Sequence, residues 1–257
     1  MSGMLEAEGL VKRFGGLAAV DDVSFSTAEG EILGVIGPNG AGKSTLFNLI
    51  TGTIPMTAGK VRFAGRDITG MKPEKVANLG VIRTFQSATV FREKTVCENV
   101  RIGYQFNQLG CPSNLFNRRR VRDFREKAGG VVAEVLDFVG LTAFKDRAAG
   151  ELSYGGQKVL GVAMALAAGP KQLLMDEPAA GLNAVETRQM GELIMAIRDK
   201  KGIDVVLVEH DMAMVTSICD RILVINRGQV LALGTPDEIQ RNPDVIEAYL
   251  GVDLELD

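Results

Sequence analysis

Tryptophan is missing from the sequence, histidine occurs once, and only three of the 257 residues are cysteine. The cysteines, Cys97, Cys111 and Cys219, lie far apart and form no C-x-x-C pair. This usage argues against a zinc site and a disulfide framework, and it is typical of a reducing compartment. The longest weakly polar run, residues 160–169, is far shorter than the roughly 20 residues that span a bilayer. Any role at a membrane therefore requires a partner.

The sequence also has no excess of positive charge. It contains 29 lysines and arginines and 32 aspartates and glutamates, which gives a net charge of −3. The overall charge therefore predicts no nucleic-acid partner. Residues 1–11 contain acidic side chains and no apolar segment, so no secretory signal is expected. With 46% hydrophobic residues, the chain is long enough for one large α/β domain, alone or with a subdomain.

The clearest motif is a glycine-rich turn that fits G-x-x-x-x-G-K-[ST] and follows an apolar strand-like run, residues 31–36. Such a turn directs backbone N–H groups inward and leads into a helix N-terminus, which together cradle a polyphosphate. Lys43 is expected to reach the outer phosphates and Ser44 to bind Mg²⁺. The predicted nucleotide-binding residues of the turn are Gly37, Pro38, Asn39, Gly40, Ala41, Gly42, Lys43, Ser44 and Thr45.

Two further apolar strands end in polar side chains. Residues 173–175 are followed by Asp176 and Glu177, and residues 205–208 lead to Glu209 and His210. Each is preceded by a helical pattern, which predicts βαβ units whose ligands lie at the carboxyl ends of the strands. Asp176 is expected to help hold Mg²⁺, and Glu177 could polarise an attacking water.

A second anion-binding helix start is predicted at residues 152–157, with the sequence LSYGGQ. A serine with two nearby glycines at a helix start offers exposed N–H groups and a hydroxyl. A chain with two such ends either has two sites or assembles one site from two copies. The residues alone leave both alternatives open.

The remaining pattern predicts antiparallel hairpins from residues 5–14, 20–25 and 31–36, then a strand at 60–63, a helix at 73–78 and a strand at 81–85. Residues 87–152 have helical apolar spacing and include a basic run, 118–125, that is either a solvated face or a contact with lipid headgroups or a permease. A final hairpin is predicted from residues 221–226 and 229–233.

Taken together, the turn at 37–45, Gln86, residues 152–157, Asp176-Glu177 and His210 resemble the nucleotide-binding subunit of ABC transporters. The peptides FNLITG, IRTFQ, TVCENVRIG, DEPAAGLN and VEHDM are similar to the branched-chain amino acid importer ATPases. The resemblance implies an α/β P-loop NTPase core of the ABC type with an antiparallel β subdomain and an inserted helical subdomain. The implied division of this single domain, 1–257, is a core of 1–86 and 159–240, a helical subdomain of 87–158 and a tail of 241–257.

The resemblance also implies roles for single residues. Glu177 is the general base, His210 contacts the γ-phosphate, and Gln86 senses Mg²⁺ and water. Phe14 stacks on adenine, the alternative being a buried phenylalanine at a strand end. The signature of one subunit caps the γ-phosphate held by the other in a head-to-tail dimer, through Ser153, Tyr154, Gly155, Gly156 and Gln157.

Three positions depart from the family pattern. Asn183 stands where most of the superfamily has aspartate, and Met164 replaces a usual arginine. Ala184 stands where the subfamily commonly has proline, so the helix that follows is expected to start less sharply.

The implied partners are membrane permease subunits, an extracytoplasmic solute-binding protein acting indirectly, and a second related ATPase or another copy of this chain. ATP and Mg²⁺ are the implied cofactors, and the implied location is cytoplasmic, on the inner face of the membrane. Residues 87–99 are expected to receive a permease helix. The alternatives are another small solute such as urea or short amides, a soluble switch on nucleic acid or the ribosome, and a regulatory module with negligible turnover.

Overall fold

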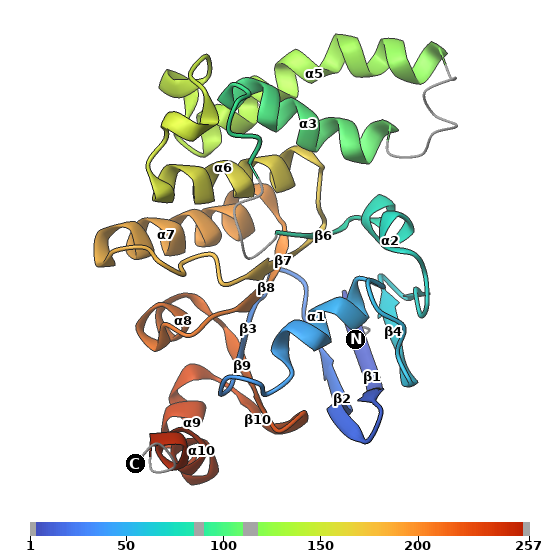
Figure 1. Cartoon of the computed structure of the whole chain (residues 1–257), viewed down its shortest axis with the longest axis vertical. Helices are drawn as coiled ribbons and strands as arrows, with labels where there is room; N and C mark the ends of the chain where they lie inside the picture. The colour runs from blue at the N-terminus through green and yellow to red at the C-terminus, as the bar shows by residue number, and fades with distance from the viewer. Residues whose placement is uncertain (1–3, 85–89, 110–117, 254–257) are drawn as a thin grey trace.

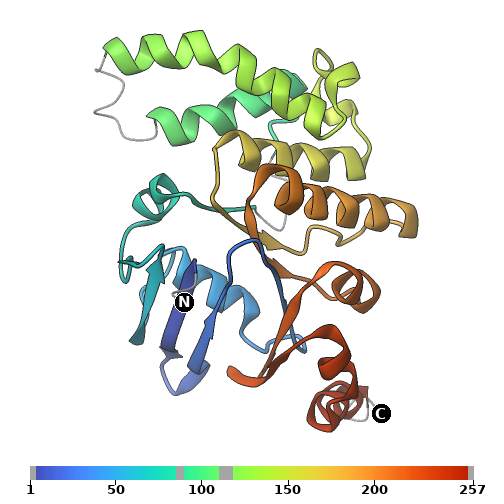
Figure 2. The same ribbon diagram turned by 180° about the vertical axis from the view of Figure 1, so that it is seen from behind.

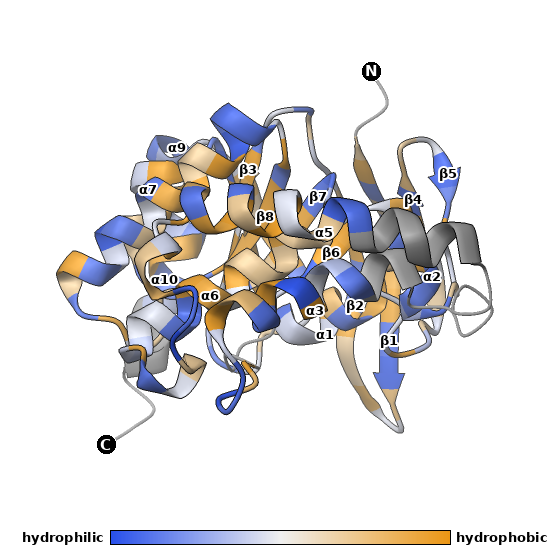
Figure 3. Cartoon of the chain, turned by 90° about the horizontal axis from the view of Figure 1, so that it is seen from above, coloured by the Kyte–Doolittle hydropathy of each residue, from blue (hydrophilic) through white to orange (hydrophobic). Residues whose placement is uncertain are grey.

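The computed structural model describes residues 4–84, 90–109 and 118–253. Figure 1 shows three helices, α3, α5 and α6, gathered at one end of the molecule and two β-sheets toward the other. The hydrophobic colours in Figure 3 gather on the strands and helix faces inside the molecule. None of the described helices combines the length and the apolar character needed to cross a bilayer.

The larger sheet has six strands in the order β10-β9-β3-β8-β7-β6. Every position of β3, β7 and β8 is buried, which is the pattern of strands covered on both faces. The neighbours from β9 to β6 pair in parallel, whereas β10 and β9 form the antiparallel hairpin that the sequence predicts. The bounds are β3 Ile32–Ile36, β6 Val81–Arg83, β7 Gln172–Asp176, β8 Asp204–Val208, β9 Arg221–Asn226 and β10 Gln229–Gly234.

The smaller sheet is antiparallel, in the order β2-β1-β4-β5. The predicted pairing of the first two strands is confirmed, but the prediction that residues 31–36 join these hairpins is wrong. Those residues form β3 inside the larger sheet, because a strand that is apolar on both faces is stabilised most when both faces are removed from water. The bounds are β1 Leu5–Phe14, β2 Leu17–Ser26, β4 Ala58–Phe63 and β5 Arg66–Asp67.

Helix α1, Lys43–Ile50, fills the space between the two sheets, as the views in Figures 1 and 2 both show. Its buried side chains Leu46 and Phe47 share one hydrophobic core with Leu33 of β3 and Val61 of β4. Because strand side chains alternate, Ile32 of β3 points instead into the second core, to which most of the later helices contribute.

Helix α7 is the longest of the helices that follow β7. Helix α7 begins at Ala184 with a complete capping box, in which Asn183 accepts from two backbone N–H groups and Glu186 bonds back. The expectation of a less sharp start is therefore wrong, because asparagine caps a helix without help from a following proline. The bounds are α2 Pro73–Leu79, α7 Ala184–Lys201, α8 Met212–Ile218, α9 Pro236–Arg241 and α10 Pro243–Asp253.

The helical end of the molecule contains α3 Val96–Leu109, α5 Arg118–Phe138 and α6 Tyr154–Ala167, with single 3-10 turns at Thr142–Phe144 and Ala149–Glu151. Helices α3 and α6 approach so closely that a Cβ added at Gly103 would lie 2.2 Å from the backbone oxygen of Met164. Glycine at this position therefore sets how near the two helices can pack.

We expect Gly103→Ala to lower the free energy of unfolding by about 1–3 kcal/mol, since the methyl group would force the α3 and α6 backbones apart. Urea unfolding followed by circular dichroism measures the change. Gly161→Ala in α6 is the matched control, because a methyl group added there would have no other atom within 4 Å. That control should be neutral or slightly stabilising, and equal effects of the two changes would contradict the close approach.

Candidate functional site

The glycine-rich turn lies between β3 and α1, at the carboxyl end of the central strand. Gly37 and Gly42 both have positive φ values, 152° and 107°, and both press against backbone. A Cβ at Gly37 would meet the oxygen of Ile225 at 2.0 Å, and one at Gly42 the oxygen of Ala19 at 2.3 Å. Only glycine fits these two positions, so the motif is a requirement of the fold as well as of ligand binding.

The Lys43 side chain lies within this turn. Its ammonium donates to the backbone oxygens of Gly37 at 2.6 Å and Pro38 at 3.0 Å. Burial lowers the pKa of Lys43, and the negative charges of Glu177 and Asp176 oppose that shift. A cation held between the turn and two carboxylates stands at the edge of the sheet where the sequence predicts phosphate binding.

The two predicted carboxylates follow β7. The Asp176 side chain is 1% exposed, and its Oδ1 atom has no hydrogen-bond partner among the described residues. Glu177 adopts a left-handed backbone with φ 49°, which is costly for a residue with a Cβ. Its N–H donates to the oxygen of Val208 at the end of β8, and this bond ties the strained residue to the neighbouring strand.

His210 reaches this carboxylate from the end of β8. Its Nε2 lies 2.7 Å from Oε1 of Glu177, whose side chain is 16% exposed. An ionised carboxylate can only accept a hydrogen bond, so the ring nitrogen is the donor in that state. The fold therefore brings together Lys43, Asp176, Glu177 and His210, which the sequence distributes over 168 positions.

Two residues of this region make contacts that the sequence interpretation did not predict. Arg83, at the end of β6, donates to Oδ2 of Asp176 at 2.6 Å. Glu209 is 3% exposed and accepts from the N–H groups of Ala179 at 2.6 Å and His210 at 3.0 Å. Burial raises the pKa of Glu209, and these backbone donors oppose the rise. For both Arg83 and Glu209, the signal in the sequence was a charged residue at the end of an apolar strand or directly after it.

The signature residues begin helix α6. Ser153 caps it by accepting from the N–H of Gly156 at 3.1 Å, and the amide of Gln157 donates to the oxygen of Leu152 at 3.0 Å. The Tyr154 ring is 51% exposed and lies against Gly181. Helices α1 and α6 lie at different levels of the molecule in both Figure 1 and Figure 2.

Phe14 ends β1 and is 52% exposed, so the alternative of a buried phenylalanine is wrong. The ammonium of Lys12 lies 4.9 Å from the ring centroid. Gln86, the predicted Mg²⁺ sensor, lies outside the described residues, as does Cys111.

The described residues contain no group of three or more histidine, cysteine, aspartate or glutamate side chains that could hold a metal. Mg²⁺ does not require one, since it usually binds one or two carboxylates together with phosphate oxygens and water. The unpartnered oxygen of Asp176 and the position of Ser44 in the first turn of α1 fit that donor set.

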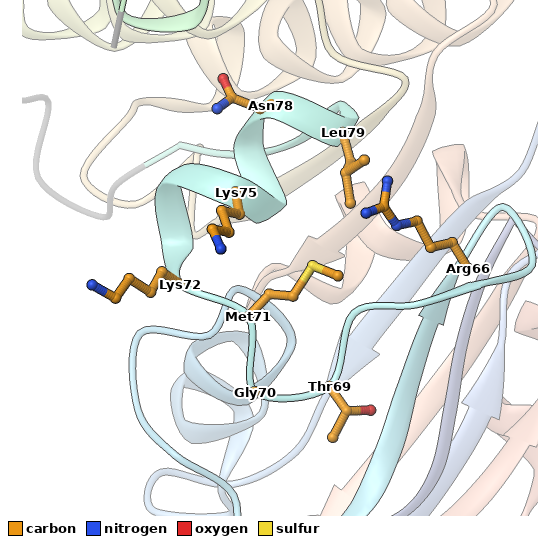
Figure 4. A pocket seen from close by; sticks show the side chains of 8 residues that line it. All are labelled: Arg66, Thr69, Gly70, Met71, Lys72, Lys75, Asn78 and Leu79. Carbon is orange, nitrogen blue, oxygen red and sulfur yellow. The ribbon is translucent and has the colours of Figure 1, made fainter. Parts of the chain in front are cut away.

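A pocket of about 630 Å³ lies apart from these residues, between β5 and α2 (Figure 4). None of the predicted site residues lines it, so we do not assign it to the nucleotide. Its lining residues are Arg66, Thr69, Gly70, Met71, Lys72, Lys75, Asn78 and Leu79.

Comparison with known families identifies the class of this site. A family model described as ABC transporter matches residues 20–180. A second, described as branched-chain amino acid ATP-binding cassette transporter, matches residues 229–255. The ATP-binding cassette MJ1267 in its ADP conformation is 34% identical with a TM-score of 0.86, covering 98% of this chain and 100% of that chain. A nucleotide-free cassette from an ABC transporter is 35% identical with a TM-score of 0.84, at 96% and 98% coverage.

Relatives that match nearly the whole chain are transport ATP-binding proteins. The high-affinity branched-chain amino acid transport ATP-binding protein BraF of Pseudomonas aeruginosa is 44% identical over 249 residues, 96% of this chain and 98% of that protein. The corresponding protein LivG of Escherichia coli K12 is 42% identical with the same coverage. The chain therefore belongs to the ABC transporter family, as one of its ATP-binding cassette ATPases. Within that family it is similar over nearly its whole length to the branched-chain amino acid transport ATP-binding proteins.

We expect Glu209→Ala to destabilise the protein by about 2 kcal/mol or more, because it removes the acceptor of two backbone N–H groups, of which that of Ala179 is buried. Urea unfolding measures the loss. Glu192→Ala, on the exposed face of α7, is the control and should change the free energy of unfolding by less than about 0.5 kcal/mol. An unchanged stability of the Glu209 variant would show that these two hydrogen bonds are not needed.

Proposed function

We propose that this ATPase energises the uptake of branched-chain amino acids through membrane permeases, at the cytoplasmic face of the membrane. The observation that carries the proposal is the 44% identity with BraF over nearly the full length of both chains. The C-terminal match over residues 229–255, in a region outside the general ABC transporter model, supports the same specificity. An extracytoplasmic solute-binding protein would deliver the solute to the permeases.

The turn and Lys43 are proposed to bind the phosphates of ATP. Lys43 would exchange the two backbone oxygens that it now contacts for phosphate oxygens, which accept more strongly because they are charged. Ser44, Asp176 and Gln86 would hold Mg²⁺, which neutralises charge on the transferring phosphoryl group. The exposed ring of Phe14 offers a surface for adenine.

Glu177 is proposed to accept a proton from the attacking water. Its strained backbone and the bond from His210 hold the carboxylate in one orientation, which favours catalysis by positioning. His210 is more exposed than Glu177, with 44% of its side chain accessible, so it can turn toward a γ-phosphate. We therefore assign the general base to Glu177 and phosphate contact to His210.

The site is proposed to be completed by a second subunit, either another copy of this chain or a related ATPase. Ser153 accepts a hydrogen bond as a helix cap and keeps its hydroxyl proton to donate to a phosphate. The exposed Tyr154 lies against Gly181 in the loop after Glu177, and the exposed Val185 lies in the first turn of α7, which follows that loop. Both would be covered in such a dimer. This arrangement would use both anion-binding helix ends in one composite site.

Permease contact is proposed for the segment before α3. The backbone of Phe91 is fixed by both side-chain groups of Asn99, at 2.7 and 3.1 Å, while its ring is 42% exposed. Val96 is fully buried and cannot contact a partner directly. A rigid backbone that presents an exposed aromatic side chain is suited to an interface anchor.

Another transported solute, such as urea or a short amide, remains the main alternative. None of the residues to which a role is assigned above is proposed to contact the solute. Transport assays with radiolabelled leucine and urea therefore distinguish the two solutes. A soluble switch on nucleic acid has no supporting observation in the described structure.

We expect Glu177→Gln to trap ATP and hold the dimer closed, because the amide cannot accept the proton from water. Gel filtration with and without Mg²⁺-ATP should then show a shift from monomer to dimer only with ATP. Adding Lys43→Ala to this variant should abolish the shift, since ATP would no longer bind. No shift despite measured ATP binding would contradict self-pairing and favour a different ATPase partner.

Phe91→Ala should reduce transport in a reconstituted permease complex about tenfold or more, as expected for a truncated aromatic anchor. ATP binding by the isolated subunit should be unchanged. Ile246→Ala, which removes another exposed apolar side chain, is the matched control and should leave transport intact. Unimpaired transport with the Phe91 variant would refute this contact.

A further inference from the structure

Arg83 joins three elements at the carboxyl edge of the large sheet. Its Nη2 donates to Oδ2 of Asp176 at 2.6 Å, and its Nη1 donates to Oδ1 of Asn48 at 2.6 Å. The guanidinium also lies over the ring of Phe47, with its carbon 5.5 Å from the ring centroid. The Arg83 side chain is only 14% exposed, so these contacts hold it in one position.

Two of the three elements, α1 and β7, carry a residue predicted to bind Mg²⁺. Asn48 lies four residues after Ser44 in α1, so the two share one face of the helix. Asp176 ends β7, and Arg83 itself ends β6, three residues before Gln86 in the sequence. A planar guanidinium with two arms can therefore fix the relative position of α1, β6 and β7 where the metal is expected.

The two oxygens of Asp176 have different surroundings. Oδ2 receives the hydrogen bond from Arg83, whereas Oδ1 is buried and has no partner among the described residues. A buried carboxylate is stable only when it is paired. The pair with Arg83 thus satisfies one oxygen and fixes the plane of the group, and the other oxygen is left for the metal shell.

We propose that Arg83 is a positioning residue of the magnesium site, acting through Asp176 and Asn48. This inference rests on the proposed function, because it takes Mg²⁺-ATP as the ligand. The positive charge of Arg83 by itself opposes a second cation. The phosphates of ATP supply most of the negative charge that Mg²⁺ needs, so the orientation of Asp176 outweighs that repulsion.

The test measures Mg²⁺ affinity in the Arg83→Gln and Arg83→Lys proteins. Binding of a fluorescent ATP analogue is titrated with Mg²⁺, and Mn²⁺ binding to the nucleotide-loaded protein is followed by electron paramagnetic resonance. We expect the half-saturating metal concentration to rise about 10–100-fold in the glutamine variant, as for other partners of metal ligands. Nucleotide binding without metal should stay unchanged. The lysine variant should show a similar loss, because lysine cannot bridge Asp176 and Asn48 in one plane.

Arg221→Gln is the matched control. Arg221 forms the same kind of pair with the buried carboxylate of Glu31, at 2.5 and 3.0 Å, but at the amino ends of β9 and β3. The metal affinity of the Arg221→Gln protein should equal that of the unaltered protein. Asn48→Ala removes the acceptor of the Arg83 Nη1 group and leaves the pair with Asp176 in place, and it should also weaken metal binding.

Three results would overturn the inference. Tighter metal binding in Arg83→Gln would mean that the arginine competes with the metal, and normal binding in Arg83→Lys would mean that only charge matters. Equal losses in the Arg83 and Arg221 variants would reveal a general effect on folding. If the unaltered protein bound the analogue without any dependence on Mg²⁺, the proposed metal site itself would fail.

Discussion

The parallel pairing of β3 with its neighbours is the constraint on which the whole site depends. β3 is held between β8 and β9, and β8 pairs with β7, so the strands share one direction. All positions of β3, β7 and β8 are buried, and a slip of one residue would exchange the side chains between the two cores. The fixed register delivers the glycine-rich turn, Glu177 and His210 to the same edge.

Buried polar groups then fix the loops that leave this edge. Glu209 joins the N–H groups of Ala179 and His210, and Lys158 of α6 donates to the backbone oxygen of Glu177 at 3.1 Å. The bond from Ala179 to Glu209 and the bond from Lys158 to Glu177 each link segments that follow different strands or helices. Such groups are costly to bury unless they are paired, so their pairing specifies one loop arrangement.

A continuous packed route connects the exposed Phe91 to the carboxyl edge of the large sheet. Asn99 of α3 holds the Phe91 backbone, and α3 contacts the α6 backbone at Gly103. Helix α6 in turn reaches Glu177 through Lys158. Because packed helices move as rigid units, this route would carry motion to a permease if the proposed function holds.

The sequence by itself determined the local features: the glycine turn, the polar ends of strands 173–175 and 205–208, the capped start of α6, and the last hairpin. These rest on residues close together in the chain, so pattern and spacing reveal them. The division into subdomains and the roles of single residues stay predictions. Only the tertiary structure decided the place of β3, the exposure of Phe14 and the contacts of Arg83 with Asp176, 93 residues away. Burial and long-range pairing depend on which surfaces meet, and no local pattern records that.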